Sequence, residues 1–459
     1  MLTGRQSRGL RSKLSWKSLC QREWESVIRD TIRMKRAKIY FETYGCSYNR
    51  ADTRILENIA SKKFEIVESA EKSDIIVLNT CYVKTATEHR IINRIKELVN
   101  QFPSKKMIIA GCMPKVDKER ALESNPKASL LSPQNVDKIE EAIEGTLASN
   151  QVFYLDYRKV DKSRLPKLWK KNEVVRIIQI CEGCADACSY CCTRIARGPI
   201  FSFSSDNIVQ EVRKGVNEGA KEFWLTAQDT SAYGLDNKEN LANLVEKIVA
   251  IEGEFFVRIG MMNPNHALKI LDQLVEVYSS SKVFKFLHLP VQSASNKILE
   301  AMLRRYTIEE AEDVIKSFRT KIPMITFDTD IIVGYPTETR DDFNETIKFI
   351  ERIKPDIVNL SKFSKRPKTS AKLNNKYDIQ EVKEKARIAH NVISRLQLEG
   401  NSRWLGWQGR ILIDEYIGGD SVGRNEYYKN IVVKDKIALG TQLTVKTVYA
   451  SKHFLLGEI

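Results

Sequence analysis

Three cysteines of one short loop carry the clearest chemistry in this sequence. Cys184, Cys188 and Cys191 follow the spacing C-x-x-x-C-x-x-C. Three thiolates can hold three irons of a four-iron cluster and leave the fourth iron open to a small molecule. A structural zinc site is the alternative, with Cys181 or Cys192 as its fourth ligand. Zinc sites usually combine two matched C-x-x-C pairs, so the spacing favours the cluster.

A second set of three cysteines lies in the N-terminal third of the chain. Cys46, Cys81 and Cys112 each come just after a segment with the pattern of a buried strand. These segments are Ile39–Thr43, Asp74–Asn79 and Lys106–Ala110. Parallel strands end at one edge of their sheet, so the three thiols are expected to converge there. Gly45 and Gly111 leave the backbone room to approach a ligand. Buried core cysteines are the alternative, but a shared metal centre explains the three positions better.

The elements around these cysteines predict two α/β units in succession. In residues 36–147 the three strands alternate with helical patterns at Ala51–Ser61 and Thr85–Phe102. This alternation predicts an open parallel sheet covered by helices. Residues 148–173, which are basic and contain a proline, read as a linker.

Residues 174–400 repeat the strand–helix pattern six times, which predicts a partial (β/α)6 barrel. The predicted strands are Val174–Ile180, Glu222–Thr226, Glu254–Ile259, Val283–Leu289, Ile325–Val333 and Asp356–Ser361. Chemistry in such barrels lies at the carboxyl ends of the strands, and the loop of Cys184 follows the first strand at that end. A charged helix near Ile379–Leu398 closes the unit.

Residues 403–459 change to short alternating strands with glycine-rich turns. This pattern predicts a small five-stranded antiparallel barrel, similar in plan to an oligonucleotide-binding fold. Arg424, Tyr427, Tyr428 and Lys429 combine basic and aromatic side chains, which suit phosphate contact and base stacking. An ordinary charged hairpin is the alternative for these four residues.

The composition limits the class of protein and its partners. The net charge of +15 over 459 residues favours a polyanionic partner, most simply a nucleic acid, over a merely solvated basic surface. No apolar run reaches about 18 residues, so no membrane span is predicted. The cysteines outside the loop are scattered, which favours a reducing compartment, the cytoplasm. We expect a monomer.

The first residues of the chain form a basic extension, residues 1–35. Residues 1–33 carry eight Arg or Lys and three Asp or Glu, and they lack the continuous apolar core of a secretory signal. They are either a disordered arm or the product of a start codon placed too early, and the second reading is slightly favoured. Cys20 in this stretch is expected to have no role.

The three units in this order resemble the radical S-adenosylmethionine (SAM) methylthiotransferases across residues 36–459. The motifs Thr43–Asp52, Leu78–Cys81 and Ala110–Pro114 look like the N-terminal cluster motifs of that family. Gly183–Cys191, followed by Arg194 and Arg197-Gly198, looks like its SAM cluster loop. Further matches are Leu225–Gly234, Leu287–Ser293, Thr329–Glu338 and Phe363–Thr369. The C-terminal barrel resembles the TRAM domain, an RNA-binding module.

The resemblance implies two [4Fe-4S] clusters and SAM as cofactors. The cluster on Cys184, Cys188 and Cys191 would bind SAM, and one electron from it would cleave SAM to methionine and a 5′-deoxyadenosyl radical. The second cluster, on Cys46, Cys81 and Cys112, would supply or relay sulfur, and a second SAM would provide the methyl group. A one-electron reductant and a sulfur donor are therefore implied as partners. Beyond the clusters no catalytic residue is assigned.

Several polar residues after the barrel strands are candidates to contact SAM. Tyr190 could lie against its adenine, and Gly334 would permit close approach of the backbone. The amino, carboxylate and ribose groups could be bound by Gln228, Gln292, Ser293 and Asp330. Each could instead be a hydrogen-bonding residue of the barrel mouth. His266 and His288 are expected to be structural, and Cys181 and Cys192 fall outside the motif.

The residues of two motifs indicate the substrate. The family modifies either an adenosine beside a tRNA anticodon or an aspartate of a ribosomal protein, and the basic charge favours tRNA. Gly45–Asn49 and Leu225–Ser231 look like the archaeal and eukaryotic threonylcarbamoyl type, whereas the bacterial isopentenyl type usually has Asn at the place of Asp229. Lys368 replaces a usual Gly of the family.

We therefore predict conversion of N6-threonylcarbamoyladenosine at tRNA position 37 to its 2-methylthio form. A methylthiotransferase acting on isopentenyladenosine or on a ribosomal-protein aspartate is the nearest alternative. A zinc-containing RNA-binding protein without catalysis is a remote one.

Overall fold

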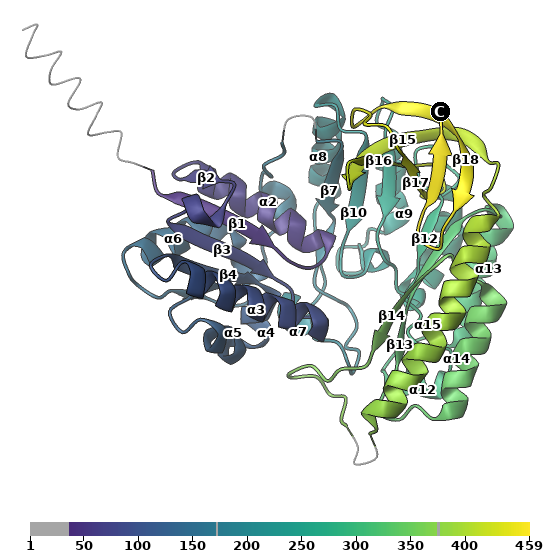
Figure 1. Cartoon of the computed structure of the whole chain (residues 1–459), viewed down its shortest axis with the longest axis horizontal. Coiled ribbons are helices and arrows are strands. Elements are labelled where there is room, and N and C mark those ends of the chain that lie inside the picture. The colour runs from purple at the N-terminus through teal and green to yellow at the C-terminus, as the bar shows by residue number, and fades with distance from the viewer. Residues whose placement is uncertain (1–35, 171–172, 374–376) are drawn as a thin grey trace, which may run out of the picture.

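The computed structural model describes residues 36–170, 173–373 and 377–459 (Figure 1). The predicted basic extension, with Cys20, lies outside the described residues. Figure 1 shows an N-terminal sheet with its helices, an α/β unit beside it, and a small C-terminal barrel in yellow on that second unit.

The N-terminal unit is a six-stranded parallel sheet in the order β2-β1-β3-β4-β5-β6. Its strands are β1 Lys38–Thr43, β2 Glu65–Val67, β3 Ile75–Thr80, β4 Lys106–Gly111, β5 Ser129–Leu131 and β6 Phe153–Tyr154. β1, β3 and β4 lie where the sequence predicts them. β2, β5 and β6 are two or three residues long, too short to give a periodic signal. β6 pairs with β5, so residues 148–173, which were predicted to be a linker, contain the last strand of the sheet.

Helices cover both faces of this sheet because its central strand is apolar on both sides. All six residues of β3 are buried. Ile76 and Leu78 pack with apolar residues of α3, whereas Ile75 and Val77 pack with those of α2 and α6. Such continuous burial is typical of parallel sheets. The helices of the unit are α2 Ser47–Ser61, α3 Thr85–Gln101, α4 Cys112–Val116, α5 Lys118–Ser124 and α6 Ile139–Leu147.

The second unit is a partial parallel barrel made of two three-stranded sheets, which confirms the predicted α/β class. The sheets are β11-β10-β7 and β12-β13-β14. Their strands are β7 Val175–Gln179, β10 Glu222–Thr226, β11 Phe256–Ile259, β12 Phe286–His288, β13 Thr326–Val333 and β14 Ile357–Lys362. A parallel bridge between Val257 and Val283 joins the two sheets, and β12 is shorter than predicted.

Helices lie outside this barrel and cover it. They are α8 Ser205–Asn217, α9 Leu241–Val249, α10 Pro264–Ala267, α11 Leu271–Val277, α12 Asn296–Ala301, α13 Ile308–Lys321, α14 Arg340–Ile353 and α15 Ile379–Ser402. A hairpin of β8 Cys181–Glu182 and β9 Phe201–Ser202, with α7 Thr193–Arg197 between its strands, follows β7. This hairpin carries the cysteine loop.

The C-terminal unit is a closed five-stranded barrel, as predicted, but it is not wholly antiparallel because β17 and β19 pair in parallel. Its strands join in the order β15-β16-β17-β19-β18. They are β15 Gln408–Ile417, β16 Asp420–Arg424, β17 Asn430–Val433, β18 Gln442–Ala450 and β19 Leu455–Glu458. Among the described residues, no helix has the length and apolar character needed to cross a membrane.

Candidate functional site

The loop of Cys184, Cys188 and Cys191 is closed at its base. β8 and β9 pair on either side of it, and the backbone N–H of Cys184 donates to the carbonyl oxygen of Gly198 at 3.1 Å. Gly183 has a φ of +85°, and a Cβ there would clash with the carbonyl oxygen of Pro199. Only glycine fits this position, so the sequence itself brings the three cysteines onto one turn.

Two sulfurs of this loop have polar neighbours of their own. A hydrogen bond of 3.0 Å joins Cys191 Sγ to the hydroxyl of Thr193, and Arg304 Nη1 donates to Cys188 Sγ at 3.5 Å. Arg304 is in turn held by Asn263 Oδ1 at 3.0 Å and by the carbonyl oxygen of Pro290 at 3.1 Å. Such donors stabilise charge on sulfur and orient the ligands of a metal.

The other three cysteines meet at the carboxyl edge of the N-terminal sheet. Cys46 caps the start of α2 after β1, Cys81 follows β3, and Cys112 begins α4 directly after β4. The backbone at Gly45 (φ +107°) passes so close to Cys81 that a Cβ would lie 2.5 Å from that residue's Cβ. The structure therefore brings these thiols together.

Asn49 fixes the two loops that carry Cys46 and Cys81. Its side-chain amide donates to the carbonyl oxygens of Tyr44 at 2.8 Å and Thr80 at 3.0 Å. The residues before both cysteines are thus tied to one side chain of α2.

Burial opposes charge on four of these thiols. It raises the pKa of Cys112 to about 12 and also raises the pKa of Cys81, Cys184 and Cys191. A bound cationic centre would offset that cost and hold the sulfurs as thiolates.

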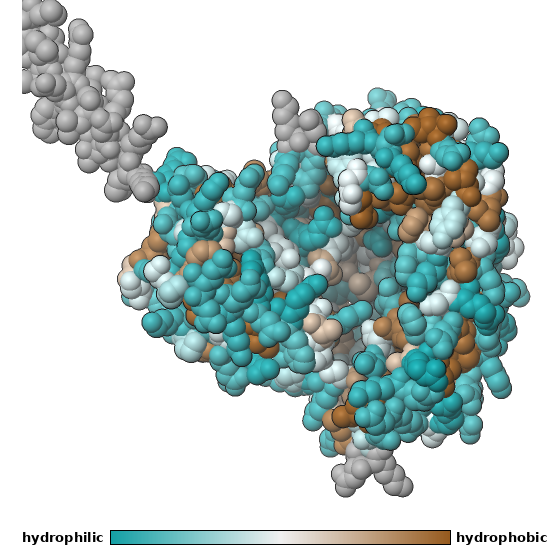
Figure 2. Space-filling view, in the orientation of Figure 1, coloured by the Kyte–Doolittle hydropathy of each residue, from teal (hydrophilic) through white to brown (hydrophobic). Residues whose placement is uncertain are grey.

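The two trios border the same space. Cys192, next to Cys191, donates from its sulfur to the carbonyl oxygen of Tyr82 at 3.4 Å, and Tyr82 is next to Cys81. Helices α4 and α7 are in contact (Figure 1). Figure 2 shows the surface hollowed between the N-terminal unit and the partial barrel. The two trios therefore lie on neighbouring loops.

Known proteins share both halves of this site. Residues 38–132 match the uncharacterized protein family UPF0004, and residues 178–350 match the Radical SAM superfamily. A probable threonylcarbamoyladenosine tRNA methylthiotransferase of Pyrococcus horikoshii is 41% identical over 427 residues, which is 92% of this chain and 99% of that protein. This chain belongs to the threonylcarbamoyladenosine tRNA methylthiotransferases. The family and the class of enzyme predicted from the motifs are confirmed.

More distant proteins agree with this membership of the methylthiotransferases. The human threonylcarbamoyladenosine tRNA methylthiotransferase is 33% identical over 450 residues, covering 95% of this chain and 76% of that protein. The solved radical SAM methyltransferase TsrM of Kitasatospora setae, with cobalamin and a [4Fe-4S] cluster bound, has a TM-score of 0.56 at 10% identity, covering 84% and 77% of the two chains. That likeness shows the fold. The superfamily implies SAM and one [4Fe-4S] cluster for this methylthiotransferase.

Three of the residues predicted to contact SAM lie at the carboxyl ends of the barrel strands. Gln228 follows β10, and its Oε1 accepts from the backbone N–H of Gly183 at 2.8 Å. Asp330 lies near the end of β13 and is hydrogen-bonded to His288 at 3.1 Å. Gln292, with a φ of +69°, follows β12 and pairs through its backbone with β13. Their contact with SAM stays a prediction.

Two other residues predicted to contact SAM have neighbours in the helical layer, and their contact with SAM stays a prediction. Ser293 is fully buried, with its hydroxyl 3.4 Å from that of Thr346 in α14. A Cβ at Gly334 would clash with Val382 of α15, so this glycine serves helix packing. Tyr190 packs beside the apolar cluster that contains Met302 of the helical layer, and its contact with adenine stays a prediction.

Two of the four residues predicted to bind RNA, Tyr428 and Lys429, hold the C-terminal barrel on the core, while Arg424 and Tyr427 pack within the barrel. The ring of Tyr428 lies 4.8 Å from Phe284, between centroids, and the ring of Tyr427 packs against the C-terminal helix region. Lys429 Nζ forms an ion pair of 2.7 Å with Asp356. Arg424 pairs with acidic residues of β15. Sequence alone could not separate aromatic side chains at an interface from those that stack on bases.

Replacing Tyr428 with alanine is expected to destabilise the protein by about 3 kcal/mol, because loss of its ring, which packs on Phe284 and Phe286, would leave a cavity between barrel and core. Tyr449→Ala, at a ring that is 56% exposed on the same barrel, should cost less than about 1 kcal/mol. Denaturant unfolding of both variants measures the difference. Equal losses would show that Tyr428 does not dock the barrel.

The sequence alone does not identify Asp229, Asn263 and Arg304 as residues that support the SAM loop. Asp229 accepts from His266 Nδ1 at 2.7 Å and from the backbone N–H of Asn263 at 3.0 Å. Asn263 in turn orients Arg304 toward Cys188. The sequence gives one signal, which is that Asp229 and His266 follow successive strands of one parallel sheet.

Cys181 and Cys192 have partners other than the trios, so iron binding should survive their loss. Cys181 is fully buried, and its sulfur donates to the carbonyl oxygen of Asp229 at 3.8 Å. Reconstituted Cys181→Ala and Cys192→Ala proteins are expected to keep the iron and sulfide content of the parent protein. Loss of about four irons from either variant would make that cysteine a ligand.

Proposed function

We propose that this chain transfers a methylthio group to N6-threonylcarbamoyladenosine at position 37 of tRNA by radical SAM chemistry. The observation that carries the proposal is its similarity to relatives named for this modification, which extends over 92% of the chain and spans both cysteine trios. In this proposal residues 36–147 hold an auxiliary cluster, residues 174–400 are the radical SAM core and residues 403–459 are a TRAM domain.

The residues that would hold the cofactors follow from the site. Cys184, Cys188 and Cys191 would hold the SAM-binding cluster, and Cys46, Cys81 and Cys112 an auxiliary [4Fe-4S] cluster. When bound, these groups and SAM supply the electron, the radical precursor, the sulfur and the methyl group.

The protein's own task would be to orient these groups and to shield them from water. Arg304 holds Cys188, and Gln228 holds the backbone of Gly183 at the start of the loop. The nearness of the trios suits a reaction in which a carbon radical must meet sulfur before it meets solvent. A one-electron reductant and a sulfur donor are the partners that this chemistry requires.

The C-terminal barrel offers a surface for tRNA away from the residues first considered. Tyr416 and Tyr449 are 40% and 56% exposed, and Lys436 Nζ lies 5.9 Å from the ring centre of Tyr416. Figure 2 shows apolar side chains gathered over this barrel. Exposed rings with neighbouring lysines suit stacking on RNA bases and contact with phosphates.

A deletion strain tests the proposed modification. Its tRNA should lack 2-methylthio-N6-threonylcarbamoyladenosine, and the wild-type gene should restore the nucleoside, whereas Cys184→Ala should not. Unchanged levels of the nucleoside in the deletion strain would contradict the proposal. Loss of 2-methylthio-isopentenyladenosine or of a methylthio-aspartate in a ribosomal protein would favour the corresponding alternative.

A zinc-containing RNA-binding protein is the alternative from another class. The match to the Radical SAM superfamily and to named methylthiotransferases disfavours it. Anaerobic metal analysis decides: about eight irons per chain support the two clusters, and zinc without iron would contradict them.

A further inference from the structure

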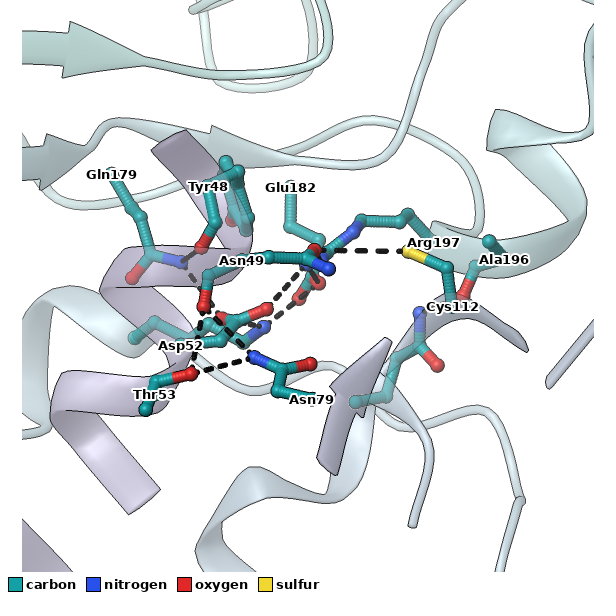
Figure 3. Close-up of polar contacts among 12 residues, drawn as sticks. Tyr48, Asn49, Asp52, Thr53, Asn79, Cys112, Gln179, Glu182, Ala196 and Arg197 are labelled. Carbon is teal, nitrogen blue, oxygen red and sulfur yellow. Dashed lines mark hydrogen bonds and ion pairs between the residues drawn. The ribbon is translucent and has the colours of Figure 1, made fainter. Parts of the chain in front are cut away.

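A buried cluster of charges, which includes Asp52, Glu182 and Arg197, joins the N-terminal unit to the SAM loop (Figure 3). Lys162 Nζ pairs with Asp52 Oδ1 at 2.8 Å and with Glu182 Oε1 at 2.9 Å. Arg197 Nη1 pairs with Asp52 Oδ2 and with the same oxygen of Glu182, both at 2.8 Å. Two cations and two anions thus balance, and the four side chains are at most 5% exposed.

The four residues come from four separate elements. Asp52 belongs to α2, Glu182 to β8 and Arg197 to α7, while Lys162 lies in the segment between the two units. Arg197 comes six positions after Cys191 in the sequence, so the helix that follows the SAM loop is the one that reaches across.

Arg197 differs from Lys162 because it also reaches the second trio of cysteines. Its Nη2 donates to Asn49 Oδ1 at 2.7 Å, and Cys112 Sγ lies 3.9 Å from that same oxygen. Figure 3 shows the Arg197 side chain extending toward Asn49, and a dashed line joins Asn49 to the sulfur of Cys112. The guanidinium also lies 4.4 Å from the ring centre of Tyr48, which fixes its plane.

We propose that Arg197 is a positioning residue that sets the reduction potential of the auxiliary cluster held by Cys46, Cys81 and Cys112. This inference rests on the proposed function, because it requires that cluster. Reduction adds one electron and therefore one negative charge to the cluster. A fixed, water-excluded positive charge near its sulfurs favours the reduced form. Arginine suits this task because it stays charged in a buried site.

The test uses the full chain with Cys184, Cys188 and Cys191 changed to alanine, so that the auxiliary cluster is the only one present. Its potential is measured by redox titration, with the EPR signal of the reduced cluster as the readout. Arg197→Gln should lower the equilibrium constant of reduction at least tenfold, which is a shift of about 59 mV to more negative potential for one electron.

Two further variants distinguish an effect of charge on the reduction potential from an effect of general damage to the fold. Lys162→Gln removes an equally buried cation that pairs with the same two carboxylates, and it should shift the potential less than Arg197→Gln. Arg197→Lys keeps the charge and should recover most of the shift. An unchanged potential in Arg197→Gln, or an equal shift in Lys162→Gln, would overturn the inference.

A second measurement covers the case in which Arg197→Gln does not retain its cluster. Glu182→Gln removes an anion that neutralises Arg197 and should move the potential at least 59 mV in the opposite direction, to less negative values. No shift in that variant would overturn the inference. If the parent with Arg197 intact holds no iron at all, the auxiliary cluster of the proposed function is contradicted, a result distinct from an unchanged potential.

Discussion

Replacing Cys184 with alanine is expected to abolish SAM cleavage and, with it, methylthiolation. Only two thiols would remain on the closed loop, so the cluster that binds SAM would lose a ligand and about four irons would be lost per chain. The measurements are iron content, the release of 5′-deoxyadenosine from SAM under reducing conditions, and the modified nucleoside.

The matched control for Cys184→Ala is Cys181→Ala, three positions upstream. Cys181 is fully buried at the same end of the barrel, but its sulfur contacts the carbonyl oxygen of Asp229. The control should cleave SAM at the rate of the parent protein. If Cys184→Ala keeps its iron and cleaves SAM, the assignment of the loop is wrong.

Replacing Cys112 with alanine is expected to stop methylthiolation while SAM cleavage continues. Cys112 belongs to the trio at the edge of the N-terminal sheet, so its loss should remove the auxiliary cluster, about four irons, and stop methylthiolation. SAM cleavage should persist, because the loop of Cys184 is formed by β8, β9 and their own hydrogen bonds. 5′-Deoxyadenosine would then form without modified nucleoside.

Met113→Leu provides the control for Cys112→Ala. Met113 is the neighbouring residue in α4 and is fully buried, and this substitution nearly conserves volume. It should leave both iron content and modification in place. Methylthiolation by Cys112→Ala at the parent rate would contradict the role of the second trio, and loss of SAM cleavage in that variant would contradict the independence of the two sites.

Much of this arrangement could be predicted because it is local in the sequence. Each cysteine of the N-terminal trio follows a strand with a strong apolar pattern, and parallel strands must end at one edge. The SAM loop lies within one short motif. β2, β5 and β6 could not be predicted, since two or three residues show no periodicity.

The residues that hold the site together could not be predicted, because their partners are distant in sequence. Arg197 meets Asn49 at a separation of 148 residues, and Lys162 meets Asp52 at 110. The motif that follows the SAM loop contains Arg197, but the sequence does not show which residues Arg197 contacts. In the same way, the sequence places Ser293 and Gly334 after strands but does not show that both have neighbours in the helical layer.

The mass spectrum of tRNA nucleosides made with the purified enzyme tests the central claim most directly. The anaerobically reconstituted chain is incubated with SAM, a one-electron reductant and tRNA that contains N6-threonylcarbamoyladenosine. The account predicts that this nucleoside decreases while its 2-methylthio form appears, and that Cys184→Ala and Cys112→Ala form none. N6-threonylcarbamoyladenosine left unchanged by enzyme that holds both clusters and cleaves SAM would contradict it.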